Sequence, residues 1–464
     1  VFLMLIESRF TEKSIVLIVV WLSAFGMPIM LSATNVAVPV IANQFNLSAT
    51  QITWIPMSYL MASAMFVLTF GKLADIVGRK RIFFFGLLIL SLSSIFAALA
   101  TTGSMLLLGR AFQGFGAAML YATQTAMVSS VYPAKERGKA IGITLAAVYL
   151  GLALGPTLGG IVMQYLSWRF NFVLHIPLII IIMILITKVP EDSELKLTEN
   201  FNFDKVGSCL YAASIGLLCF GVTNLPDLSS LLLLILFIVT AALFIKHSLR
   251  SSFPIWDLRI FASNTMLIRS CLASFLMYAA TYSNVVILSL YLQDLRQLSP
   301  SQAGLIMSIQ PGTMAILSAT LGRLSDVIEP RFLATIGMVI SAFSLFSLSF
   351  LASGELSAYF LISLVFIGVG FSLFSSPNTH AIMSSVTRKN YGLASGTAAT
   401  TRVLGQLSSM FLISFSLSFI VGDQLITEET LPSLLDAIEL SFFIAGFVCL
   451  LGALLSVTRG KLHE

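Results

Sequence analysis

The residues of this chain that could do chemistry are polar side chains placed inside long apolar segments. Arg110, Gln113, Ala117, Tyr121 and Gln124 follow one another at intervals of three or four residues. Because such spacing puts side chains on one face of a helix, we expect a stripe that lines water rather than lipid. An arginine inside a membrane costs on the order of 3 kcal/mol unless it meets a cavity or a partner, which makes Arg110 a candidate functional residue. The alternative is that Arg110 only binds carbonyl groups at a helix end.

Proton exchange would need a group whose pKa can shift between two states of the protein. None of the 21 acidic residues lies deep within a long apolar run. Asp75 stands at the edge of such a run, and His175 and His380 are the side chains near a cavity that titrate close to neutral pH. Asp75, His175 and His380 are therefore the coupling candidates among the groups that titrate. The alternative for each histidine is a packed side chain held by hydrogen bonds.

Polar residues within the apolar runs are candidates for the wall of a substrate cavity. The set is Asn35, Gln113, Tyr121, Gln124, Asn284, Gln310, Asn378 and Arg402. Arg402 and Arg110 together would make the interior of the protein net cationic. Such an interior disfavours cationic compounds and suits a neutral or anionic amphiphile.

Patterns that would indicate an enzyme are missing from the sequence. It has no HExxH, no phosphate-binding loop and no paired acids within an apolar run, and its four cysteines lack CxxC spacing. The net charge of +5 comes from short basic loops rather than from a basic face. We therefore expect no catalytic site, no cofactor, no metal and no nucleic-acid partner.

The elements that must position these residues are membrane helices. Hydrophobic residues make up 57% of the chain and charged residues only 10%, too few to cover a soluble globule. Apolar runs of about 20 residues, long enough to cross a bilayer, must be helical because lipid satisfies no backbone hydrogen bonds. The runs are 14–40, 51–73, 82–101, 104–130, 138–164, 169–188, 206–225, 228–248, 264–293, 300–323, 331–352, 357–386, 391–420 and 437–458. The sequence predicts an all-α protein with fourteen transmembrane helices.

Basic residues are sorted to alternate connections between these runs. With the N-terminus inside, 21 of the 26 lysines and arginines fall on the cytoplasmic side. This asymmetry predicts a multi-pass protein of the cell membrane with both termini in the cytoplasm.

The two ends of the chain repeat each other. Residues 71–75 (GKLAD) are echoed by 322–326 (GRLSD), and 126–131 (AMVSSV) by 381–386 (AIMSSV). Similar offsets predict two bundles related by an axis along the membrane normal. We expect a first six-helix bundle at 1–189, a linker with an inserted helix pair at 190–262, and a second six-helix bundle at 263–464.

Two glycine-containing stretches are candidates for conformational change. The first holds Gly71, Asp75, Gly78, Arg79 and Lys80, where glycines would let the backbone turn and Asp75 would cap or pair. Asp326 is its counterpart in the second half.

The second stretch carries Gly151, Gly155 and Gly159 at intervals of four, with Pro156 beside them. A row of glycines without side chains lets another helix approach closely. The proline removes a backbone hydrogen bond, which allows the helix to bend there. The alternative is ordinary small-residue packing.

Three stretches resemble motifs of the major facilitator superfamily. Residues 71–81 (GKLADIVGRKR) resemble its GxLaDrxGrkxxl signature, 110–116 (RAFQGFG) its RxxQGxG pattern, and 151–160 (GLALGPTLGG) its antiporter motif GxxxGPxxGG. The resemblance implies two bundles that rock around a midplane cavity, a coupling role for Arg110, and export.

Fourteen runs, Trp168-Arg169 and Phe203-Asp204 make the chain similar to the fourteen-helix drug:proton antiporter branch of that superfamily. That branch usually carries an aspartate in its first helix, where this chain has Met30. We expect a monomeric exporter of hydrophobic or amphipathic small molecules in the lipid bilayer, with protons as a candidate coupling ion. A metabolite, anion or lipid transporter without conventional proton coupling is the first alternative, and a non-transporting sensor or scaffold is the second.

Overall fold

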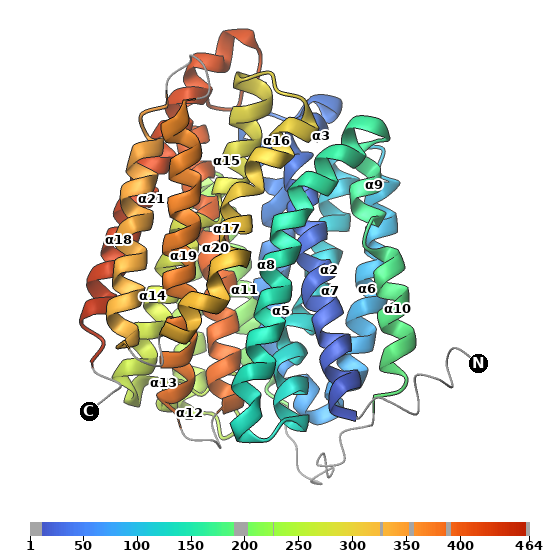
Figure 1. Cartoon of the computed structure of the whole chain (residues 1–464), viewed down its shortest axis with the longest axis vertical. Helices are drawn as coiled ribbons and strands as arrows, with labels where there is room; N and C mark the ends of the chain where they lie inside the picture. Colours follow the sequence, from blue (N-terminus) through green and yellow to red (C-terminus); the bar gives the residue numbers. More distant parts are fainter. Residues whose placement is uncertain are drawn as a thin grey trace.

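The computed structural model of the chain is a bundle of long helices that run roughly parallel to one axis (Figure 1). The structure describes residues 12–189, 203–225, 227–324, 328–351, 357–386 and 391–460. The start of α2 (Glu12–Val36) and the end of α21 (Leu431–Val457) lie at one end of the bundle, which we call the terminal end. The opposite end carries the short helix α3 (Val38–Phe45), and we call it the α3 end.

The first half of the chain folds into a group of helices that pack on each other before the chain moves on. These helices are α2 (Glu12–Val36), α3, α4 (Ala49–Ile52), α5 (Trp54–Val77), α6 (Arg79–Ala98), α7 (Gly103–Val131), α8 (Ala134–Tyr165), α9 (Trp168–Val173) and α10 (Ile176–Ile186). Within the group, α7 packs against both α5 and α6, and α2 packs along α8.

The second half forms a similar group, reached through two intervening helices. Those two are α11 (Lys205–Thr223) and α12 (Leu228–Arg250). The group itself contains α13 (Leu258–Ser263), α14 (Thr265–Thr281), α15 (Asn284–Leu290), η1 (Tyr291–Leu295), α16 (Pro300–Met307), α17 (Ile309–Leu324), α18 (Pro330–Leu348), α19 (Ala358–Ser384), α20 (Tyr391–Ile420), η3 (Glu428–Thr430) and α21 (Leu431–Val457). Its main packing pairs are α18 with α19 and α21, and α14 with α20.

Within the described residues, twelve helices are long and apolar enough to cross a membrane. The expectation of fourteen spans is therefore not supported by this count, and two of the expected runs account for the difference. The run at 104–130 is the continuous helix α7, but Arg110 and its glutamines lower its mean hydropathy. The run at 300–323 is divided into α16 and α17, because Pro311 has no N–H to donate to the carbonyl of Met307.

The halves meet along a tight contact near the α3 end, which we call the α8–α16 seam. A Cβ atom at Gly304 would lie 2.2 Å from the carbonyl oxygen of Pro156, and one at Gly160 would lie 2.3 Å from that of Pro300. Thr157 and Ser308 share a hydrogen bond of 2.8 Å across the same contact. The seam comprises Pro156, Thr157 and Gly160 on one side and Pro300, Gly304 and Ser308 on the other. Only glycine permits backbones to come this close.

A second contact between the halves closes the α3 end itself. Ser48 and Leu425 form an isolated β-bridge, and the amide of Ala49 donates to the carbonyl of Gln424 at 2.8 Å. Thr50 donates to the Asp423 carboxylate at 2.8 Å. The hydroxyls of Ser48 and Thr50 hold the pKa of Asp423 below its usual value. These hydrogen bonds join the two halves of the chain at the α3 end.

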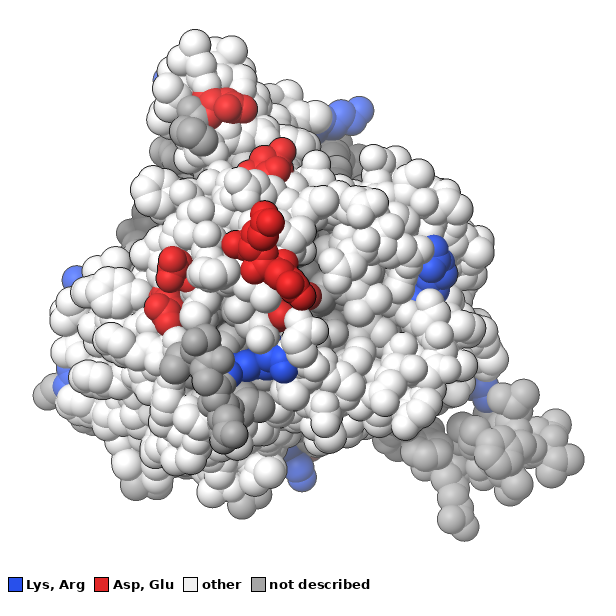
Figure 2. Space-filling model, turned by 90° about the horizontal axis from the view of Figure 1, so that it is seen from above, with Lys and Arg blue, Asp and Glu red and all other residues white. Residues whose placement is uncertain are grey.

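Charge is distributed unevenly between the two ends of the bundle. Acidic side chains gather near the middle of the α3 end, where few basic side chains are visible (Figure 2). Exposed acids at this end include Asp423, Glu428, Glu429 and Asp436. The basic cluster Arg79-Lys80-Arg81 lies at the terminal end, where α5 gives way to α6.

Apolar side chains cover the sides of the bundle as well as its interior. On α12, Leu228, Leu232, Ile235 and Ile238 are all more than half exposed, and few of this helix's residues are buried. Such a surface requires lipid around it. α11 lies between α12 and the main bundle and contacts both α5 and α20.

Candidate functional site

The central cavity of the bundle is the candidate functional site, because both halves supply its walls. Its volume is about 150 Å³. Residues of α2, α7 and α8 form one side, and residues of α14, α17, α19 and α20 form the other. A pocket built this way changes shape whenever the halves move against each other.

Five of the polar residues expected at the cavity wall lie in its lining: Asn35, Tyr121, Gln124, Gln310 and Arg402. Gln124 donates to the hydroxyl of Ser23 at 2.9 Å, which fixes its amide group. Arg402 is the one cation in the described lining, and no aspartate or glutamate is part of it. The described wall is thus apolar with amide, hydroxyl and guanidinium groups.

Aromatic side chains form the part of the wall that sequence reasoning missed. Tyr149, Tyr278 and Phe371 pack edge to face, with centroid distances of 6.5 Å from Tyr149 to Phe371 and 5.3 Å from Tyr278 to Phe371. Tyr282 lines the cavity one turn beyond Tyr278. Helical spacing places Tyr149 on the same face of its helix as Pro156, which also lines the cavity, because the two residues are seven apart.

Arg110 and Gln113 are not in the cavity lining but are fully buried behind it. Arg110 donates from Nε to the carbonyl of Ile55 at 3.1 Å and from Nη1 to Oε1 of Gln113 at 2.8 Å. Its guanidinium carbon lies 4.7 Å from the centre of the Tyr59 ring. The polar stripe expected on this helix is thus divided between the cavity wall and the interior of the first half.

His175 is connected to this buried group through a chain of hydrogen bonds. Gln113 donates to the hydroxyl of Ser94 at 2.8 Å, and that hydroxyl lies 3.3 Å from Nε2 of His175. His175 is buried, and its Nδ1 has no hydrogen-bond partner among the described residues. The arrangement matches a packed, hydrogen-bonded histidine and leaves one ring nitrogen unused.

The remaining candidates of the second half lie outside the cavity lining. Asn284 is fully buried, and neither atom of its amide has a partner within the described chain. Asn378 donates to the carbonyl of Ser270 at 3.1 Å and accepts from Arg459 at 2.5 Å. His380 follows on the same helix, α19, with Nδ1 unpartnered in the described region.

The first glycine-containing stretch, residues 71–80, lies at the terminal end and links helices of the first half. Gly78 has φ of +110° and ends α5, whereas Gly71 lies inside that helix rather than at a turn. Asp75 accepts from Arg79 at 3.3 Å. Lys80 donates to the carbonyls of Thr187 and Val189, just beyond the end of α10. Asp326, the counterpart of Asp75, lies outside the described residues.

The glycine stripe of α8 faces α2 within the first half. A Cβ atom at Gly151 would lie 2.3 Å from the carbonyl oxygen of Phe25, one at Gly155 1.9 Å from the Ser32 hydroxyl, and one at Gly159 2.6 Å from the Ala33 Cα. Gly151, Gly155 and Gly159 thus permit close packing against α2. Pro156, on a different face, contacts α16 in the seam.

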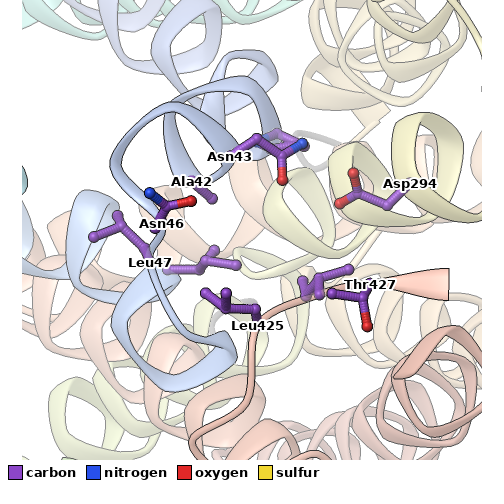
Figure 3. Close-up of a pocket in the computed structure, with 10 residues that line it drawn as sticks. Ala42, Asn43, Asn46, Leu47, Asp294, Leu425 and Thr427 are labelled. Carbon is purple, nitrogen blue, oxygen red and sulfur yellow. The ribbon is translucent and has the colours of Figure 1, made fainter. Parts of the chain in front are cut away.

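A second pocket, of about 220 Å³, opens at the α3 end (Figure 3). Asn43 and Asp294 lie near each other in its lining with their oxygens facing, and Leu425 and Thr427 also line it. It lies beside the β-bridge that closes this end, away from the aromatic wall. We therefore keep the central cavity as the candidate site.

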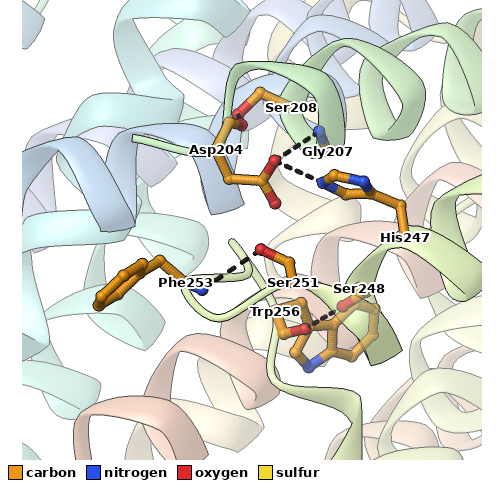
Figure 4. Close-up of polar contacts among 8 residues, drawn as sticks. All are labelled: Asp204, Gly207, Ser208, His247, Ser248, Ser251, Phe253 and Trp256. Atoms are coloured by element: carbon orange, nitrogen blue, oxygen red, sulfur yellow. Dashed lines mark hydrogen bonds and ion pairs between the residues drawn. The ribbon is translucent and has the colours of Figure 1, made fainter. Parts of the chain in front are cut away.

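The inserted helices are tied together at the terminal end (Figure 4). Asp204 accepts from the backbone of Gly207 at 2.8 Å and lies 2.7 Å from Nε2 of His247. Ser248 donates to the carbonyl of Trp256 in the connection that follows. These contacts fix α11 against α12. The described residues contain no cluster of three potential metal ligands here or elsewhere.

Comparison with known proteins gives a single family. The family model described as Major Facilitator Superfamily matches residues 20–406 and 270–461. The riboflavin transporter RibZ of Clostridioides difficile is 31% identical over 96% of this chain and 97% of its own. The multidrug resistance protein Stp of Mycobacterium tuberculosis is 30% identical over 80% of this chain and 70% of its own. A crystal structure of a D-xylose–proton symporter superposes with a TM-score of 0.69 at 15% identity, covering 97% of this chain and 98% of that one.

Proposed function

The chain belongs to the Major Facilitator Superfamily, and we propose that it exports a planar, neutral or anionic amphiphilic molecule by alternating access. The observation that carries the proposal is the composition of the central cavity. Five aromatic rings line it, with one cation and no carboxylate among the described residues. Such a wall stacks on a flat apolar molecule, binds its polar edge through amides and hydroxyls, and repels a cation.

Export as the direction of transport is supported by two sequence features. Residues 151–160 resemble the antiporter motif, and Stp, a similar protein, is a multidrug resistance protein. RibZ is similar over nearly the whole chain and is a riboflavin transporter, which favours a second candidate, transport of a flavin-like metabolite. Both candidates share a flat, hydrogen-bonding cargo.

We further propose that α7 and the pair α16–α17 also cross the bilayer, which gives fourteen spans. In support, α7 contacts α5 and α6, and α17 contacts α19 and α8, so both lie within the bundle. The polar residues that lower the hydropathy of α7 are buried or face the cavity and need not meet lipid. The proposed division into 1–189, 190–262 and 263–464 follows the same pattern.

Basic residues at the terminal end and acidic residues at the α3 end support cytoplasmic termini in the cell membrane. In this orientation the structure is closed toward the outside. Proton coupling through Asp75, His175 or His380 and a monomeric state remain part of the proposal.

Flux measurements on proteoliposomes test these proposals. Riboflavin, the anionic dye fluorescein and the cationic dye ethidium are compared, each with and without an imposed pH gradient. We expect riboflavin or fluorescein to cross faster than in protein-free liposomes, and ethidium to cross at the protein-free rate. Ethidium transport equal to that of the other two would contradict the proposed selectivity, and flux of none of them would favour a sensor or scaffold. Acceleration by the gradient would support proton coupling.

A further inference from the structure

The buried guanidinium of Arg110 is a charge whose counter-ion the described protein does not supply. Its side chain is fully buried. The described ionisable groups that interact electrostatically with it are the hydroxyls of Tyr59, Tyr121 and Tyr282 and the imidazole of His175, and none is a carboxylate. A buried charge without an opposite charge is strongly unfavourable, even when a ring face stabilises it by about 2 kcal/mol.

One nitrogen of the guanidinium is left free. Nε and Nη1 donate to Ile55 and Gln113, while Nη2 has no hydrogen-bond partner among the described residues. The Tyr282 hydroxyl is also buried, and the side chain that it meets is that of Asn35. A guanidinium N–H and a phenolic O–H both donate to an anion.

Tyrosine side chains lie between the cavity and this guanidinium. Tyr121 and Tyr282 line the cavity, and the Tyr121 hydroxyl lies 3.1 Å from that of Tyr59, whose ring covers the guanidinium. Rotation of these phenols would connect Arg110 with the cavity.

We propose that Arg110 binds a small monovalent anion through its free Nη2, with help from the hydroxyls of Tyr59 and Tyr282. The anionic group is either a free inorganic ion such as chloride or the acidic group of the transported molecule. The second source rests on the proposed transport function, whereas the first does not. Bound here, the anion neutralises the guanidinium and changes the relative stability of the conformations in which Arg110 is buried.

Met30 offers a way to supply the missing charge from the protein. Its side chain is fully buried, and its sulfur lies 3.5 Å from Nε2 of Gln113, the amide that also accepts from Arg110. An aspartate at this position would place a carboxylate close to the guanidinium. Met30→Asp should therefore replace the bound anion.

The test is the midpoint of thermal unfolding of the purified full chain, measured as sodium gluconate is exchanged for sodium chloride at constant ionic strength. A ligand that binds the folded state raises the midpoint in a saturable way. We expect a saturable rise for the wild type and for Arg402→Gln, the control that removes the one cation of the described cavity wall. We expect the rise to be lost in Arg110→Gln. In Met30→Asp the midpoint should be higher than that of the wild type in gluconate and should not respond to chloride.

Three results would overturn the proposal: no saturable response in the wild type, an unchanged response in Met30→Asp, or loss of the response in Arg402→Gln. Naphthalene-2-carboxylate and its neutral alcohol then distinguish the two sources. If only the carboxylate competes with chloride, the site binds the acidic group of a transported molecule. If neither compound competes, the site binds a free inorganic ion. Equal competition by both would show that the site does not select charge, and would also overturn the proposal. Because the chloride response needs no flux, it stands or fails separately from the proposed function.

Discussion

Replacing Gly304 by alanine should weaken the closure of the α3 end. The new Cβ atom would lie 2.2 Å from the carbonyl oxygen and 2.9 Å from the carbonyl carbon of Pro156, and 3.3 Å from the Thr157 Cα. All three are backbone atoms, so no side chain can rotate away, and α8 and α16 must separate.

The magnitude follows from the cost of overpacking. An extra methyl group in a tight contact costs about 1–3 kcal/mol. Only conformations in which α8 and α16 touch bear this cost, so the equilibrium should shift toward opening of the α3 end. A difference of that size corresponds to about a 5- to 150-fold change in the equilibrium constant.

Labelling of a cysteine at position 53 measures this shift. Thr53 is fully buried and its hydroxyl lies 3.4 Å from that of Ser414 in the other half, so Thr53→Cys reports opening of the α3 end. The background carries Cys209→Ser, because Cys209 is the exposed cysteine. A membrane-impermeant maleimide should modify the Gly304→Ala protein several-fold faster.

The matched control is Gly396→Ala, since a Cβ atom at Gly396 would meet nothing within 4 Å. It should leave the labelling rate unchanged. Equal rates in Gly304→Ala and Gly396→Ala would refute the reasoning that the α8–α16 seam holds this end closed.

Three further predictions concern single charges. Arg402→Gln should increase ethidium flux relative to fluorescein flux in proteoliposomes, because it removes the one cation of the described cavity wall; an unchanged ratio would argue against charge selection there. The lowered pKa of Asp423 means that its ionised form stabilises the closed α3 end. That stabilisation is present above the ordinary carboxyl pKa of about 3.9 and is lost as the pH falls through the lowered value. Maleimide reacts with the thiolate, so the rate at position 53 is divided by that of free cysteine at the same pH. This relative rate should rise in acid, and in Asp423→Asn the rise should be smaller. Arg459→Ala should destabilise the protein by roughly 2–4 kcal/mol, since it removes charge-assisted bonds to Asn378 and the Pro330 carbonyl; a thermal midpoint within a degree of the wild type would contradict this.

The burial of Arg459 lowers its pKa to about 10, so it stays charged at neutral pH. Sequence reasoning assigned this residue to topology alone. Its hydrogen bonds to Asn378 in α19 and to the Pro330 carbonyl in α18 show that it also links the end of α21 to these two helices. Basic residues at helix ends look alike in a sequence, and only tertiary contacts distinguish a buried one.

The expected apolar runs correspond to helices because lipid leaves the backbone no alternative to helix at such lengths. Spacing also predicted which polar side chains share one face of a helix. It did not predict how far along the helix axis each side chain lies from the cavity. Arg110 and Tyr121 share a face of α7 yet lie about 16 Å apart along its axis. Tyr121 reaches the cavity, whereas Arg110 lies where α5 and α9 cover it, beside Tyr59 and Phe172. Asn284 and Asn378 were assigned to the cavity for the same reason, because a sequence gives no measure of depth within a bundle.

The position of Pro156 connects the cavity to the seam. This residue lines the central cavity, and its carbonyl oxygen is the atom that Gly304 approaches. On the other side, Met307 lines the cavity one turn after Gly304. Since one stretch of backbone on each helix forms both surfaces, a cargo that separates Pro156 from Met307 must also separate the two helices at the seam. We therefore expect occupation of the cavity and closure of the α3 end to be linked through this shared backbone.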